Sequence, residues 1–197
     1  MRNQVAFFLL LFASSIALAQ NNKQYLLEYY ASTEAELQKD IAGLNETQMA
    51  FKATPESWSV SQCLEHIILT EKMLYDRIQA GLAASSNIEE MGAPTNTDEK
   101  IVEMVTDRST KFKAPAELAP EGKYTSPEAA MEELKAGREA ILELVNNTPD
   151  AALRDHVSES PAGIVDAYQN FLFLAGHTAR HTLQLQEVKA NPAFPKS

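Results

Sequence analysis

The sequence predicts an all-α fold, a four-helix bundle with a long crossover between the second and third long helices. Four long segments carry apolar side chains at the three- and four-residue spacing of amphipathic helices, with charged residues between them. Residues 83–125 separate the second segment from the third, and Pro115 and Pro120 interrupt this stretch. A connection of that length between long helices is typical of bundles with a crossover.

The first two long helices have clear boundary signals. We expect the first over residues 23–44, and Pro55 prevents its continuation into the second. The second should begin at Ser59, because Ser59 and Gln62 have the spacing of a capping box in which each side chain bonds to the other residue's backbone amide. We expect this helix to end near residue 80, where Gly81 can act as a C-terminal cap.

The second half of the chain contains the crossover and two more long helices. Residues 96–108 are expected to form a short helix within the crossover. The third long helix should span residues 126–146, because Ser126 is a good N-cap and Pro127 suits the first helical position. The last long helix is expected from about residue 163 to residue 189.

Residues 1–19 have the pattern of a secretory signal peptide. Arg2 precedes a short apolar run, and Ala17-Leu18-Ala19 is a small-x-small cleavage site, which would make Gln20 the mature N-terminus. The apolar run is shorter than the roughly 20 residues that span a bilayer. We therefore expect an exported protein, periplasmic or secreted, with one helical domain over residues 20–197 and no stable membrane insertion after cleavage.

Charge and cysteine content exclude several classes of function. The formal net charge is −10, and no cluster of lysine and arginine interrupts the acidity, so nucleic acid is not an expected partner. Cys63 is the only cysteine, which excludes an internal disulfide. It can be a buried packing residue or a reactive thiol, and the first is the commoner outcome.

Three of the four histidines indicate a metal site. His177 and His181 are four residues apart on a predicted helix, so their rings stack on one face and can bind one ion. That face also carries large apolar residues and should point into the bundle. His66, on the second helix, can supply a third ligand. The alternative is that the imidazoles simply form hydrogen bonds to their neighbours.

The remaining candidate residues carry weaker signals. Gln184 and Asn170 share the helical face of the two histidines and are candidates to orient them, and Thr33 is a candidate pocket residue. Glu65 should point away from the face of His66 towards solvent. His156 is expected at the surface or at a helix cap rather than in the metal site.

The chain resembles the DinB-like proteins. The first half of the resemblance lies in residues 43–48, in residues 51–60, which end in Glu56-Ser57-Trp58-Ser59-Val60, and in Leu64-Glu65-His66. The second half lies in residues 177–184 and in Asn191-Pro192-Ala193-Phe194-Pro195. The resemblance implies a four-helix bundle whose three histidines, here His66, His177 and His181, bind a metal ion. Some relatives are thiol S-transferases, others resemble metal-dependent hydrolases, and many have no established activity, so the resemblance implies the site more firmly than the reaction.

These observations lead to the hypothesis of an exported, divalent-metal-dependent enzyme of the hydrolase or thiol-transferase type. Zinc is the expected ion, with nickel, iron or manganese as alternatives. The substrate would be a small molecule of unknown identity, the catalytic residues are not identified, and a homodimer is compatible with the sequence. Thiol transfer fits export less well, because the thiols that such enzymes use are cytosolic. The alternative function is a non-catalytic bundle with a structural metal or a small bound ligand.

Overall fold

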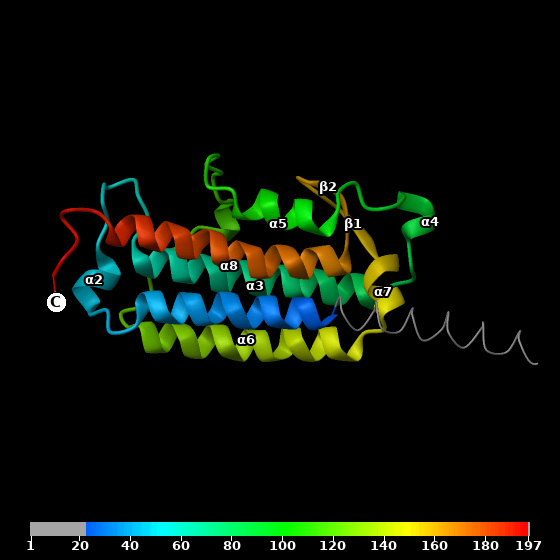
Figure 1. Ribbon diagram of the computed structural model, residues 1–197, viewed down its shortest axis with the longest axis horizontal. Helices are drawn as coiled ribbons and strands as arrows, with labels where there is room; N and C mark the ends of the chain where they lie inside the picture. The colour runs from blue at the N-terminus through cyan, green and yellow to red at the C-terminus, as the bar shows by residue number, and fades with distance from the viewer. Residues whose placement is uncertain (1–22, 197) are drawn as a thin grey trace, which may run out of the picture.

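Four long helices lie side by side in the computed structural model, which describes residues 23–196 (Figure 1). The first is helical over residues 23–41. The other three are α3 (Val60–Ala83), α6 (Pro127–Asn147) and α8 (Ala167–Lys189). The predicted helical bundle is confirmed, whereas the predicted signal peptide, residues 1–19, lies outside the described residues.

The helix starts agree with the capping signals of the sequence. The Ser59 hydroxyl accepts a hydrogen bond from the Gln62 amide at 3.2 Å, and the Gln62 side chain accepts from the Ser59 amide at 3.1 Å. Ser126 caps α6 in the same way. The predicted end of the second helix near residue 80 is wrong, because Gly81 lies within α3. A glycine inside a helix costs only about 1 kcal/mol relative to alanine, so it need not end one.

The predicted crossover between α3 and α6 is confirmed. The crossover contains α4 (Ile88–Met91), α5 (Asp98–Thr106) and the 3-10 helix η1 (Ala116–Leu118). The short helix α2 (Glu46–Ala50) lies earlier in the chain, before α3. The predicted short helix over residues 96–108 corresponds to α5, which begins one residue after its N-cap, Thr97. Helix α5 packs along α8 on the outside of the bundle (Figure 1).

The predicted start of the last helix near residue 163 is wrong. After α7 (Asp150–Asp155), the chain forms an antiparallel hairpin of β1 (Val157–Ser160) and β2 (Gly163–Asp166). Gly163 has a φ of +92°, which suits the tight turn between the strands. Asp166 ends the hairpin and caps α8, its carboxylate accepting from the Gln169 amide at 2.7 Å.

The bundle core consists of two apolar clusters, one towards each end. Cys63 is fully buried in the first cluster, together with residues such as Ile67 and Leu185. Burial raises the pKa of the Cys63 thiol to about 12, so the thiolate does not form near neutral pH. This confirms the interpretation of Cys63 as a packing residue.

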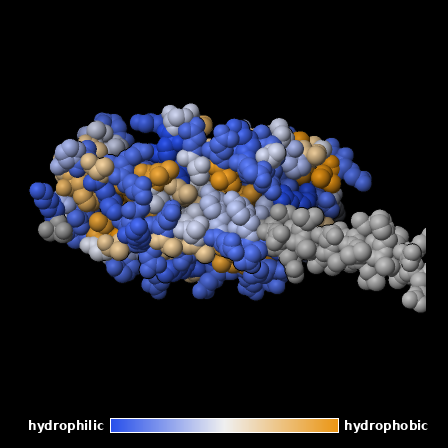
Figure 2. All heavy atoms as spheres, in the orientation of Figure 1, coloured by the Kyte–Doolittle hydropathy of each residue, from blue (hydrophilic) through white to orange (hydrophobic). Residues whose placement is uncertain are grey.

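The surface agrees with the acidic, polar composition. The face drawn in Figure 2 is mostly hydrophilic, and its apolar side chains occur in small separate groups. Within residues 23–196, no helix combines the length and the apolarity that crossing a membrane requires.

Candidate metal centre

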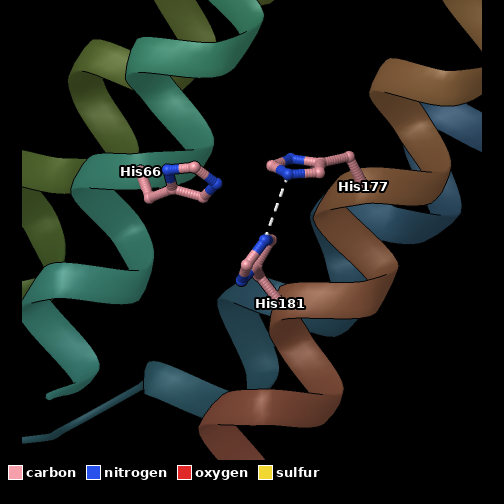
Figure 3. Close-up of side chains that lie close together, drawn as sticks. All are labelled: His66, His177 and His181. Carbon is pink, nitrogen blue, oxygen red and sulfur yellow. Dashed lines mark hydrogen bonds between the residues drawn. The ribbon is translucent and has the colours of Figure 1, made fainter. Parts of the chain in front are cut away.

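The three predicted histidines come together between α3 and α8 (Figure 3). His66 extends from α3, and His177 and His181 extend from successive turns of α8. One nitrogen from each ring can be chosen so that all three lie within 4.8 Å of one another. The closest pair is Nε2 of His177 and Nε2 of His181, 3.1 Å apart. Helical spacing thus brings two of the rings together, and packing of α3 against α8 adds the third.

The Nδ1 atoms of His66 and His181 face oxygen acceptors. Nδ1 of His66 lies 2.8 Å from the carbonyl oxygen of Leu118, and Nδ1 of His181 lies 2.9 Å from Oε1 of Gln184. Both Nδ1 atoms must carry the proton to donate to these oxygens, so a neutral ring leaves a lone pair on Nε2. Hydrogen bonds of this kind orient metal-binding histidines in other proteins. His177 differs, because its buried Nδ1 has no hydrogen-bond partner among the described residues.

The environment keeps all three imidazoles neutral. Burial, followed by the neighbouring His181 and His66, holds the pKa of His177 well below its usual value. Burial, followed by His66, lowers the pKa of His181 to about 3. The pKa of His66 is also lowered, mainly by burial. Only the neutral form of imidazole has a free lone pair, so these shifts favour the state that can bind a metal.

Aromatic side chains form the walls around the cluster. Trp58, which precedes the cap of α3, has its ring centroid 4.8 Å from that of His66 and 5.9 Å from that of His181. Phe173 stacks on His177 at 5.7 Å. The histidines retain only 5%, 8% and 6% of their surface exposed, in chain order. Such a nearly closed, partly aromatic site would admit only a small ligand.

Of the three residues predicted to orient the histidines or to line a pocket, one contacts the histidine cluster. Gln184 contacts His181, as the shared helical face predicted. Asn170 instead donates to the Ser158 hydroxyl and to the Asp166 carbonyl oxygen, near the hairpin. Thr33 is buried and donates to the carbonyl oxygen of Tyr30, within its own helix. Gln184 is therefore the one of the three that touches the histidine cluster.

Two charged residues beside the ligands are buried by the crossover. The expectation that Glu65 faces solvent is wrong, because its carboxylate accepts hydrogen bonds from three backbone amides of residues 121–123. Arg180 is likewise buried and donates to backbone carbonyls, including that of Thr110 at 2.7 Å. His156 lies outside the cluster, as predicted, and bonds to the Ala152 carbonyl oxygen at the end of α7.

The donor set fits a divalent metal ion. Zinc binds imidazole nitrogen at about 2.0–2.1 Å in tetrahedral geometry, which places two such nitrogens about 3.4 Å apart. The 3.1 Å between the Nε2 atoms of His177 and His181 is close to this value, and the full set within 4.8 Å needs only small side-chain movements. Because the proton of His181 lies on Nδ1, Nε2 of His177 donates to Nε2 of His181 in the metal-free site, and an ion would take the place of this shared proton.

The fold and the site define a helical-bundle protein with a three-histidine cluster between two of its long helices. The family model of the DinB superfamily matches residues 29–185, and the chain belongs to this superfamily.

Two proteins of Bacillus subtilis are similar to the chain. The uncharacterized protein YuaE of strain 168 is 23% identical over 167 residues, which cover 83% of this chain and 96% of YuaE. The solved structure of YfiT, described as a probable metal-dependent hydrolase with an unusual four-helix bundle topology, matches with a TM-score of 0.60 at 15% identity. That match covers 88% of this chain and 89% of YfiT, and at this identity it supports the fold.

Proposed function

We propose that His66, His177 and His181 together bind one divalent metal ion and that the protein is a metal-dependent enzyme. The observation that carries this proposal is the meeting of three buried, neutral imidazoles, two of which have their Nδ1 atoms turned to oxygen acceptors. Zinc is the expected ion, and nickel, iron and manganese also accept imidazole ligands.

Within residues 23–196, three potential ligands come together and no fourth lies beside them. Among the described residues, the metal-competent group contains the three histidines and no carboxylate. The two buried carboxylates of α3 are engaged elsewhere, Glu65 with the crossover amides and Glu71 with Arg138. Three protein ligands with a free coordination position are typical of catalytic zinc, whereas structural zinc has four. This favours catalysis over the alternative of a structural metal.

Hydrolysis is the reaction type that the site supports best. A divalent ion held by His66, His177 and His181 would supply Lewis-acid chemistry, which polarises a substrate oxygen and activates water. The chain itself would orient two ligands through Leu118 and Gln184, and would exclude bulk water with Trp58 and Phe173. The description of YfiT as a probable metal-dependent hydrolase agrees with this proposal. Thiol transfer is the second candidate, supported by the same open position.

A reaction screen with defined metal content tests the proposal. The metal-free protein would be reloaded with one equivalent of zinc, nickel, iron or manganese and offered small carboxylic esters, amides and phosphoesters, and separately an electrophile with a low-molecular-weight thiol. We expect metal-dependent hydrolysis that is absent in His177→Ala. Tight metal binding with a large rise in melting temperature, but no turnover in either screen, would instead support the structural-metal alternative.

We also propose that the protein is exported and acts on a small molecule outside the cytoplasm. The support is the signal-like sequence of residues 1–19 and the acidic charge, which disfavours nucleic acid as a partner. Expression of the full chain followed by N-terminal sequencing of the exported fraction tests this. A mature chain that begins at Gln20 is expected, and an uncleaved cytoplasmic chain would contradict the proposal.

A further inference from the structure

The first two turns of α3 fasten the end of the crossover to the bundle. Nε2 of Gln62 donates to the carbonyl oxygen of Pro120 at 3.2 Å, and the Ser61 hydroxyl accepts from the backbone amide of Tyr124 at 3.0 Å. Between these two contacts, Glu65 accepts from residues 121–123. The crossover therefore passes directly over the part of α3 that carries His66.

Glu65 makes the strongest of these contacts. Its Oε2 atom accepts from the backbone amides of Glu121, Gly122 and Lys123 at 2.8, 2.5 and 3.2 Å. Hydrogen bonds to an ionised carboxylate are roughly twice as strong as neutral ones, and successive amides that converge on one oxygen form an anion-binding nest. Gly122 has a φ of +90°, and a Cβ there would lie 3.3 Å from Cγ of Gln62, so the nest depends on glycine.

The same segment supplies the acceptor that orients His66. Leu118, the last residue of η1, places its carbonyl oxygen 2.8 Å from Nδ1 of His66. Glu65 and His66 are consecutive residues of one rigid helix, and their two contacts on the crossover, residues 121–123 and Leu118, are only a few residues apart. The position of the Leu118 carbonyl over His66 thus depends on how firmly Glu65 holds the next residues of the crossover.

We propose that Glu65 is a positioning residue for the histidine site. It fixes the crossover so that the Leu118 carbonyl keeps the proton of His66 on Nδ1 and leaves Nε2 free to bind the ion. This inference rests on the proposed metal site and deepens it. It gives the Glu65 carboxylate, which is not one of the proposed ligands, control over the orientation of His66. Loss of a group that orients a metal ligand typically lowers metal affinity 10–100-fold.

The test measures both metal affinity and the tautomer of His66. Wild type, Glu65→Ala and Glu65→Gln, each with ¹⁵N-labelled histidine, would be titrated with zinc against a chromophoric chelator. The metal-free proteins would be compared by long-range ¹H–¹⁵N NMR, which reports which ring nitrogen carries the proton. Val145→Ala is the control, because Val145 is fully buried in the core cluster at the other end of the bundle from the first turns of α3.

We expect Glu65→Ala to weaken zinc binding about 10–100-fold and to turn His66 into a mixture of tautomers. Glu65→Gln should fall between Glu65→Ala and wild type, because its amide oxygen still accepts hydrogen bonds but carries no charge. Val145→Ala should leave the zinc affinity and the tautomer of His66 unchanged, even if it lowers the melting temperature as much as Glu65→Ala does. If Glu65→Ala does not fold, Glu65→Gln carries the test alone.

Two other results separate this inference from the proposed function. Unchanged affinity and an unchanged Nδ1–H tautomer in the Glu65 variants would overturn the positioning role while the metal site stands. Failure of wild type to bind zinc, and then nickel, iron or manganese in the same titration, would overturn the proposed function. The NMR comparison would then still decide whether Glu65 sets the tautomer of His66.

Discussion

Breaking the buried ion pair between Arg138 and Glu71 should destabilise the bundle strongly. Arg138 is 1% exposed and Glu71 is 3% exposed, and Nη2 of the arginine lies 2.7 Å from the carboxylate. In Arg138→Met, the Glu71 carboxylate stays buried, and among residues 23–196 its remaining hydrogen-bond donor is the Thr178 hydroxyl at 2.9 Å. Removing one partner of a buried pair costs about 3–5 kcal/mol, because the other charge is left uncompensated.

This cost is large enough to measure by thermal or urea unfolding. For a domain of 150–250 residues, 1 kcal/mol shifts the melting temperature by about 2–4 °C, so Arg138→Met should melt about 6–20 °C below wild type. Glu71→Met should show a smaller loss, because Arg138 keeps the Glu34 carboxylate at 3.8 Å and the carbonyl oxygen of Tyr30 at 3.1 Å. The double variant should recover most of the stability, because no buried charge remains unpaired. Single losses below about 1 kcal/mol, or losses that simply add in the double variant, would refute the reasoning.

Two further predictions concern acidity and helix packing. The metal-free protein should lose stability as pH falls from about 6.5 towards 3, because the histidine pKa values are lowered in the folded state and the unfolded chain then binds more protons. The slope approaches about 1.4 kcal/mol per pH unit for a histidine that is protonated in the unfolded chain and neutral in the folded one. His181→Gln should reduce the slope in urea unfolding measured at several pH values, and an unchanged slope would contradict the lowered pKa of His181. Gly176→Ala should cost about 1–3 kcal/mol, because its Cβ would lie 2.4 Å from Cγ1 of Val105. Val105→Ala in the same chain should restore part of that loss, and a neutral Gly176→Ala would show that α5 is free to move away from α8.

The parts of the fold that depend on local sequence were predictable. The capping box of Ser59 and Gln62 involves residues three apart, and the pairing of His177 with His181 follows from helical periodicity alone. The hairpin before α8 was missed, although a local signal existed. Asp166 precedes Gln169 at the spacing of an N-cap, which places the helix start after Asp166 rather than near Gly163.

The parts that depend on distant backbone were not predictable. Glu65 is buried by amides 56–58 residues away in sequence, and backbone amides carry no residue-specific signal apart from Gly122 in the left-handed region. The burial of Arg138 likewise depends on Glu71, 67 residues earlier. Without knowledge of such a partner, the sequence alone leads one to expect a charged residue next to a ligand on the helix to face solvent.

Metal content of the full chain tests the central claim most directly. The protein would be purified without an affinity tag or chelating resin, and its metals measured by mass spectrometry beside His66→Ala, His177→Ala and His181→Ala. His156→Ala is the matched control, because His156 bonds to the end of α7 and lies outside the cluster. The three-histidine site predicts about one ion per chain in wild type and in His156→Ala, and little in the other variants. Absence of metal in wild type, with none taken up from zinc, nickel, iron or manganese, would contradict it.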